Sequence, residues 1–160
     1  AQGQVRQAWL DDLMAHPFVQ QPPPKSAGRE QFGGPFVQEL IHRTHPSSPD
    51  TWYDLFATVT RFTAMAIFYH YKRWIAPHQP ITEVIVSGGG VHNPVLMREL
   101  THVFHPLPVS TSANYGIDPD SKEALAFAIL ASERIDGKPT NIPAVTGAQK
   151  LVLLGKITEL

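Results

Sequence analysis

Residues 84–94, VIVSGGGVHNP, contain the clearest fold signal in this chain of 160 residues. The segment from Ile81 to Val86 is largely β-branched and apolar, which predicts a buried strand. The glycines that follow Ser87 allow the backbone to turn sharply, because glycine lacks a Cβ atom. Asn93-Pro94 is typical of a helix cap followed by a first-turn proline, so a helix is expected through about Val103. The sequence therefore predicts a strand, a glycine turn and a helix in succession.

Upstream of this stretch, helical patterns alternate with a proline-rich segment. Residues 4–15 place apolar side chains at helical spacing, which predicts a short amphipathic helix ending near His16-Pro17. Consecutive prolines and several glycines between residues 20 and 34 predict an extended connector. A long helix is expected from Pro49, capped by Ser48 and ending before Pro77. Its single buried face should comprise Trp52, Leu55, Phe56, Val59, Phe62, Met65, Ala66 and Tyr69.

Downstream of the glycine turn, strands and helices continue to alternate. Residues 107–111 predict a second short strand, and residues 151–158 a last one after a loop at 141–148. Asp118 or Asp120 can cap another helix, which Gly137 would end. This order predicts an α/β fold class, a sheet covered by helices. The small number of strands indicates part of a larger sheet assembly.

The composition excludes several classes of function. With 42% hydrophobic and 17% charged residues, the chain is expected to fold as one globular domain. Its formal net charge of -1 provides no general attraction for nucleic acid or an anionic membrane, so neither partner is expected. Cysteine is absent, which excludes disulfides and thiolate chemistry and is compatible with the cytoplasm. The longest apolar run, around residues 64–69, is too short to cross a bilayer.

The glycine turn is the first candidate site, with two interpretations left open. Bare backbone after a buried strand lets a ligand approach closely, and the next helix offers unpaired N–H groups to anionic groups, as a nucleotide site requires. The same turn is also a common structural corner. It is neither a Walker loop nor a GxGxxG fingerprint, because the required lysine and glycine spacings are missing.

Two other chemistries fit the sequence less well. Ser87 precedes the glycines, but a hydrolase nucleophile elbow needs glycine two positions earlier, where Ile85 stands. The histidine pairs 42/45 and 102/105 have a spacing that could bind metal from one helix face. The second histidine of each pair precedes a proline, where helices tend to end, and no acidic or thiolate partner is evident. Solvated or capping histidines are favoured, and no metal site is predicted.

The second candidate site is the turn from Tyr115 to Ala124, which places three carboxylates around one helix start. Capping and compensation of the helix dipole are favoured for Asp118 and Asp120. Glu123 lies three residues after Asp120, as in a capping box, and its role stays open. The alanines at 124, 128 and 131 permit close packing of another helix, and ordinary core packing is favoured for them.

Several segments resemble the anhydro-N-acetylmuramic acid kinase family. The matching strings are SGGGVHNPVLMREL, YGIDPDSKEALAFAILA, NIPAVTGA with LGKI, PPPKSAGREQFG and DLFATVTRFTAMAI. The resemblance implies the second domain of an actin-like and hexokinase-like (ribonuclease H-like) sugar kinase. Members open the 1,6-anhydro ring with water and phosphorylate the 6-hydroxyl, using ATP and Mg²⁺, in cell-wall recycling. Gly88, Gly89, Gly90 and Asn93 then match the nucleotide-binding motif, and Glu123 matches the segment that reaches the sugar.

The chain also departs from that family. Its members carry a Gly-Thr-Ser-Met-Asp-Gly-type phosphate loop and a catalytic aspartate in a segment like Asp-Thr-Gly-Pro-Gly-Asn, and neither string occurs here. We therefore expect residues 1–160 to be a C-terminal nucleotide-binding domain without catalytic residues, inactive alone, with a helix and connector at 1–34 and an α/β body at 35–160. A complementing N-terminal half or a second copy is the expected partner. The alternative is a non-catalytic interaction module, and Lys25 and Ser26 are assigned to structure.

Overall fold

The computed structural model describes residues 3–158, which form two compact units. The first unit contains the chain up to Val86 together with Gly90–Ser110. The second contains Ser87–Gly89 and the chain from Thr111 onward. The first unit is built from helices and a small sheet, whereas the second is helical and irregular. The subdivision expected at residue 34 stays a prediction, although residues on both sides of it share a hydrophobic core.

The N-terminal segment is tied to the long helix α5 (Pro49–His70) by polar bonds. Asp54 is buried on α5, where its Oδ1 accepts a hydrogen bond from the Gln4 amide at 2.6 Å. Its Oδ2 pairs with the Arg6 guanidinium at 2.5 Å, and the Arg6 amide donates to Thr58 Oγ1 at 3.0 Å. The bond from Gln4 and the charge of Arg6 hold the pKa of Asp54 below its usual value. These bonds place the start of α1 (Gln7–Met14), the predicted first helix, against α5.

The predicted connector contains more helix than its prolines suggest. The turn α2 (Pro17–Gln20) precedes it, and the turn α3 (Arg29–Phe32) lies within it, so only the part between them is extended. Lys25 Nζ donates to the carbonyl oxygens of Phe18 and Gln21, both at 2.6 Å, and lies over the Phe18 ring. These bonds support the structural role expected for Lys25.

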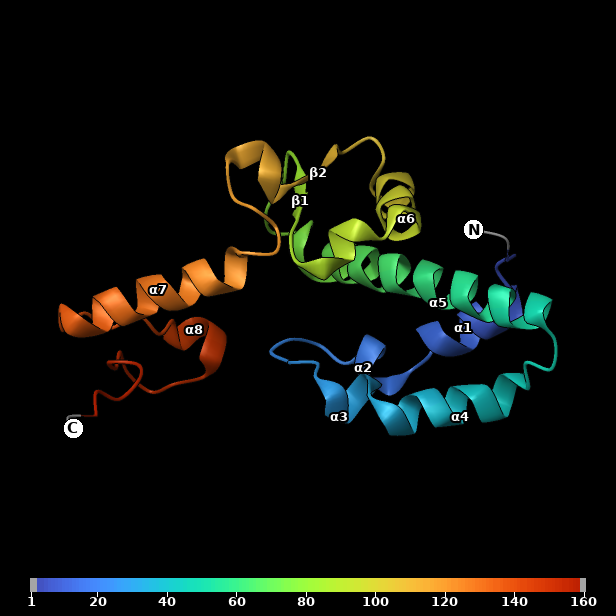
Figure 1. The fold of residues 1–160 in the computed structure, drawn as a ribbon, viewed down its shortest axis with the longest axis horizontal. Helices are drawn as coiled ribbons and strands as arrows, with labels where there is room; N and C mark the ends of the chain where they lie inside the picture. The colour runs from blue at the N-terminus through green and yellow to red at the C-terminus, as the bar shows by residue number, and fades with distance from the viewer. Residues whose placement is uncertain (1–2, 159–160) are drawn as a thin grey trace. The chain divides into compact units, whose positions relative to one another are not determined.

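Helix α4 (Gly34–Thr44) is an element that the sequence analysis missed. It is joined to α5 by a short turn, and the two helices run in opposite directions (Figure 1). Phe36 and Leu40 of α4 pack against a core formed by Leu10, Leu13, Val19 and Phe62. This first core therefore combines α1, α2, α4 and α5.

Helix α5 begins and ends as predicted. The Ser48 and Thr51 side chains form a capping box with Pro49 at the first position, and a π-helical turn (Tyr71–Ile75) ends the helix before Pro77. The prediction of a single buried face was wrong, because Phe56 is 61% exposed whereas Asp54, Thr58 and Ala64 are buried. The physical reason is that α5 lies between α1 and α6 and buries side chains on both sides (Figure 1).

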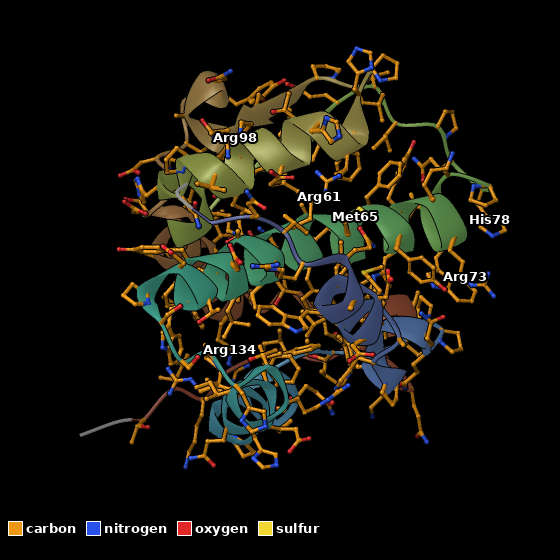
Figure 2. All side chains as sticks on the ribbon, turned by 90° about the vertical axis from the view of Figure 1, so that its right-hand side faces the viewer. Arg61, Met65, Arg73, His78, Arg98 and Arg134 are labelled. Carbon is orange, nitrogen blue, oxygen red and sulfur yellow. The ribbon has the colours of Figure 1, made fainter. Side chains whose placement is uncertain are left out.

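The glycine-turn region forms a strand-helix-strand unit, and the predicted order is confirmed. The strands β1 (Val84–Val86) and β2 (Val109–Thr111) form a two-stranded parallel sheet, joined through α6 (Pro94–Phe104). A second core of Ala64, Leu100 and Phe104 lies between α5, α6 and the strands. Arg61 extends from α5 toward α6, where it pairs with Glu99 (Figure 2). The chain is thus an α/β protein with shorter strands than predicted.

The second unit contains α7 (Lys122–Ile135) and the one-turn helix α8 (Pro143–Thr146). The capping prediction for Asp118 was wrong: its Oδ1 accepts from the Asp120 amide and its Oδ2 from the Ser121 hydroxyl, so it organises the turn before the helix. Gly137 follows the end of α7 with φ +70°, as predicted. The core packing expected for the alanines at 124, 128 and 131 was wrong, because all three are exposed, as are Phe127 at 67% and Ile135 at 76%.

The predicted last strand is also wrong. Within the described part of residues 151–158 the backbone is irregular and largely exposed. The side chain of Asn141 supplies the hydrogen bonds that a neighbouring strand would make. Its Nδ2 donates to the Lys150 carbonyl at 2.9 Å, and its Oδ1 accepts from the Val152 amide at 2.7 Å. A strand needs a partner backbone, and an amide side chain ties this segment at two points only.

Candidate functional site

The glycine turn follows β1 and is shaped for close approach. Gly88 has φ +86°, a conformation that favours glycine, and its amide donates to the Pro119 carbonyl at 3.0 Å. This bond joins the glycine turn to the turn before α7. A Cβ atom built on Gly89 would meet nothing within 4 Å, so the backbone of Gly89 faces open space. A ligand could therefore lie directly against the main chain at this position.

The glycines and Glu123 border the same hollow in the second unit. This hollow, which we call the α7 hollow, has a volume of about 560 Å³, within the size range of small-molecule sites. Gly88 and Gly89 form one wall, whereas Asp120, Lys122 and Glu123 contribute charged side chains. The rest of the lining is Pro119, Ala126, Phe127 and Leu130. Two segments singled out from the sequence for different ligands thus lie around one space.

Gly90 and Asn93, the other predicted nucleotide-binding residues, belong to the first unit. Asn93 caps α6: its Oδ1 accepts from the amides of Val95 and Leu96 at 3.0 and 3.1 Å. A Cβ atom on Gly90 would lie 3.5 Å from Leu96 Cδ2, an ordinary contact. The side-chain carbonyl of Asn93 is therefore occupied in the cap that the sequence predicted. Its role toward a nucleotide stays a prediction.

The serine of the glycine turn has neighbours that do not suit a hydrolase. Ser87 Oγ donates to the Pro119 carbonyl at 3.4 Å and accepts from Ser112 Oγ at 3.1 Å. Serine hydrolases need a base, usually histidine, in contact with the nucleophile. Among the described residues the hydrogen-bond partners of Ser87 are this hydroxyl and this carbonyl, so the arrangement offers no activation.

Both histidine pairs lie at the C-terminal ends of helices. The rings of His42 and His45 lie 5.4 Å apart, and His45 ends α4 in a left-handed conformation with φ 44°. His102 lies in the last turn of α6, and His105 follows that helix. Within residues 3–158 no three histidine, aspartate or glutamate side chains gather as ligands for a metal ion.

The sequence analysis missed two features of potential function. Lys122 borders the α7 hollow, and the signal for it was its position beside Glu123 in the same turn. The second feature is an apolar groove of about 580 Å³ in the first unit, which we call the α4–α5 groove. Its lining includes Phe36, Leu40, Leu55, Val59 and Phe62. The helical spacing of Phe36, Val37, Leu40 and Ile41 could have revealed its α4 side.

Comparisons with known proteins agree on one family. The profile described as anhydro-N-acetylmuramic acid kinase matches residues 1–159. The chain is 44% identical over 151 residues to the protein of that name from Salinibacter ruber (strain DSM 13855 / M31), covering 93% of this chain and 37% of that one. It is 42% identical over 159 residues to the Bacillus cereus (strain AH187) protein, an alignment that covers 98% of this chain and 41% of that one. For Clostridioides difficile (strain 630), identity is 39% over 158 residues, covering 99% and 40%.

The similarity thus includes the glycine turn, α7 and the tail, whereas the chain spans about two fifths of the length of these relatives. In the described chain, no helix combines the length and apolar character that a membrane span requires.

Proposed function

This chain belongs to the anhydro-N-acetylmuramic acid kinase family, and we propose that it forms the nucleotide-binding C-terminal part of such an enzyme. The complete enzyme would open the 1,6-anhydro ring of its amino-sugar substrate with water and phosphorylate the 6-hydroxyl. ATP would be the phosphate donor and Mg²⁺ its counterion, as phosphoryl transfer generally requires. The reaction would serve peptidoglycan recycling in the cytoplasm. The fold proposed for the whole enzyme is actin-like and hexokinase-like, and the chain would supply its second domain.

The observation that carries this proposal is the convergence of Gly88, Gly89 and Glu123 on the α7 hollow. Backbone without side chains at Gly89 permits a flat or anionic group to approach the main chain. The Glu123 carboxylate can accept hydrogen bonds from the hydroxyl groups of a sugar. A hollow lined by both features suits an enzyme that must hold a nucleotide and a sugar near one another. Nucleotide-binding roles are also proposed for Gly90 and Asn93.

We further propose that phosphoryl transfer requires residues outside these 160. A kinase must clamp the phosphates and orient or deprotonate the nucleophile. The phosphate-loop and aspartate strings typical of the family do not occur in these 160 residues. The chain alone would bind nucleotide weakly and turn over no sugar. A complementing N-terminal half would restore activity, and a homodimer is a further part of the proposal.

The test is a calorimetric and thermal-shift titration of the chain with Mg-ATP, with and without 1,6-anhydro-N-acetylmuramic acid. We expect a saturable rise in melting temperature, because a ligand that binds only the folded state stabilises it. No shift up to millimolar nucleotide would reject the nucleotide-binding role. Phosphate transfer by the chain alone would reject the proposed need for a complementing half.

A non-catalytic interaction module is the second candidate, favoured by the exposed apolar surface. The α4–α5 groove and the exposed side chains of Phe127, Ile129 and Ile135 on α7 are apolar surfaces that proteins usually cover. Such a module would bind its partner without nucleotide. Light scattering of the chain with the N-terminal half of the Salinibacter ruber relative, followed by an assay for phosphate transfer, would test this, since a complex that forms without nucleotide and transfers no phosphate is expected only for the module.

A further inference from the structure

Lys122 is the one cationic side chain that borders the α7 hollow within residues 3–158. We propose that Lys122 binds an anionic group of the ligand that occupies this hollow, a role that rests on the proposed function. The hollow supplies a defined space, because the lining comes from the glycine turn, the turn at Pro119 and the first turns of α7. Lys122 therefore lies at the border of a hollow that could hold a ligand.

The ammonium group of Lys122 is not used by the fold. Among the described residues, no carboxylate lies within ion-pairing distance of it. Lys138, just beyond the other end of α7, shows the contrast: its Nζ lies 2.9 Å from Asp136 Oδ2 and 3.6 Å from Glu133 Oε1. Those two carboxylates raise the pKa of Lys138. Lys138 is thus paired with carboxylates near the helix end, whereas Lys122 makes no such pair among the described residues.

The charges around the hollow restrict the class of ligand. Asp120 and Glu123 also border it, so two carboxylates accompany the single ammonium group. Carboxylates accept hydrogen bonds from hydroxyl groups and repel anionic groups, so the anionic group of a ligand is expected beside Lys122 and away from Asp120 and Glu123. The aromatic and aliphatic part of the lining, Ala126, Phe127 and Leu130, can contact an apolar ring face. The lining therefore fits a hydroxylated ring compound with an anionic group beside Lys122.

Two ligands of the proposed enzyme have this chemistry. The sugar acid carries a carboxylate, and ATP carries phosphates on a ribose. Both anions would be bound by the same charge-assisted hydrogen bonds from an ammonium group. To learn which of the two anions Lys122 binds, each anionic ligand can be compared with an uncharged analogue that has the same ring system.

The experiment measures binding to the full chain, by calorimetry and by NMR titration, for two ligand pairs. The first pair is 1,6-anhydro-N-acetylmuramic acid and the uncharged 1,6-anhydro-N-acetylglucosamine, and the second is Mg-ATP and adenosine. In Lys122→Met we expect the affinity for one anionic ligand to fall about fivefold to tenfold, as for an exposed charged contact, while its uncharged analogue binds as before. Lys122→Arg should keep most of the affinity, and added salt should weaken wild-type binding more than that of Lys122→Met.

Lys138→Met is the matched control, because it removes a lysine near the same helix outside the hollow. If Lys122→Met no longer prefers 1,6-anhydro-N-acetylmuramic acid to its uncharged analogue, Lys122 binds the carboxylate of the sugar acid. If it no longer prefers Mg-ATP to adenosine, Lys122 binds the phosphates. Lys122 has no such role if both preferences persist, or if Lys122→Met weakens charged and uncharged ligands equally. Wild-type chain that binds none of the four ligands would instead reject the proposed function, and the inference with it.

Discussion

The two units of this chain use their charged residues differently. In the first unit, Asp54 is bonded to Arg6, Arg61 to Glu99, and Lys25 to backbone carbonyls. In the second unit, Lys138 pairs with Asp136, whereas Lys122 borders a hollow without an ion pair among the described residues, and most apolar side chains of α7 are exposed. The first unit is organised for stability, whereas the second presents groups that a ligand or a partner could use. Ligand binding is therefore expected to depend mainly on the second unit, and folding mainly on the first.

The largest effect should come from the first core. Phe62→Ala removes a buried ring (7% exposed) and should lower the free energy of unfolding by about 3–5 kcal/mol. Phe56→Ala, on the same helix but 61% exposed, should cost less than about 1 kcal/mol. Urea unfolding followed by circular dichroism would measure both. Equal losses would contradict the assignment of buried and exposed sides to α5.

The next effect concerns the glycine turn. Gly89→Val should weaken Mg-ATP binding by tenfold or more, because its side chain would fill space that the ligand needs. Stability should change by less than about 1 kcal/mol, since a Cβ atom there meets nothing within 4 Å. Gly34→Val also points into open space but lies at the start of α4, so it should leave binding unchanged. Unchanged ATP affinity in Gly89→Val would remove the turn from the site.

A smaller effect is expected at Asn93, which caps α6 and is also a proposed nucleotide-binding residue. Asn93→Ala should lower stability by about 1 kcal/mol through loss of the α6 cap, and Asn93→Ser should restore most of it. Thermal unfolding and ATP titration of both variants separate the two roles. If Asn93 only caps the helix, Asn93→Ser will bind ATP as the wild type does. If it also contacts nucleotide, the serine variant will be stable but bind more weakly.

The smallest effect is the change with pH in the stability that the Asp54 carboxylate contributes. Because the pKa of Asp54 is lowered in the folded state, its contribution to stability is present above the unfolded value of 3.8 and is lost as the pH falls through the folded pKa. Asp54→Asn should therefore be less stable than the wild type at pH 7, and the difference should shrink below about pH 4. Denaturation at several pH values measures this. A constant difference across that range would show that the carboxylate charge contributes nothing.

Local signals explain what could be predicted from the sequence. The caps at Ser48 and Asn93, the glycine turn and the left-handed Gly137 each depend on neighbouring residues alone, and all are present. The strand prediction for the end of the chain was wrong because a strand depends on residues that are distant in sequence. A strand at 151–158 needs a partner backbone, and the structure supplies the Asn141 side chain instead. Helix α4 was missed although its apolar spacing is regular, because the glycines and proline at its start suggested a continued connector.

The site was predictable as a set of residues rather than as an arrangement. Glycines after a strand and carboxylates before a helix are visible in the sequence, so Gly88, Gly89 and Glu123 could be singled out. Their position around one hollow depends on the bond from the Gly88 amide to the Pro119 carbonyl, a contact between distant segments. The involvement of Lys122 depends on that arrangement as well. Pairwise packing of this kind has no local signature.

The most direct test of a nucleotide site in the second unit is an NMR titration of the isotope-labelled chain with Mg-ATP, followed at assigned backbone amides. We predict saturable shifts at Gly88, Gly89, Lys122 and Glu123, the residues that border the α7 hollow, with little change along α4. The absence of shifts up to millimolar ATP, or shifts confined to the α4–α5 groove, would contradict the assignment of nucleotide binding to the α7 hollow.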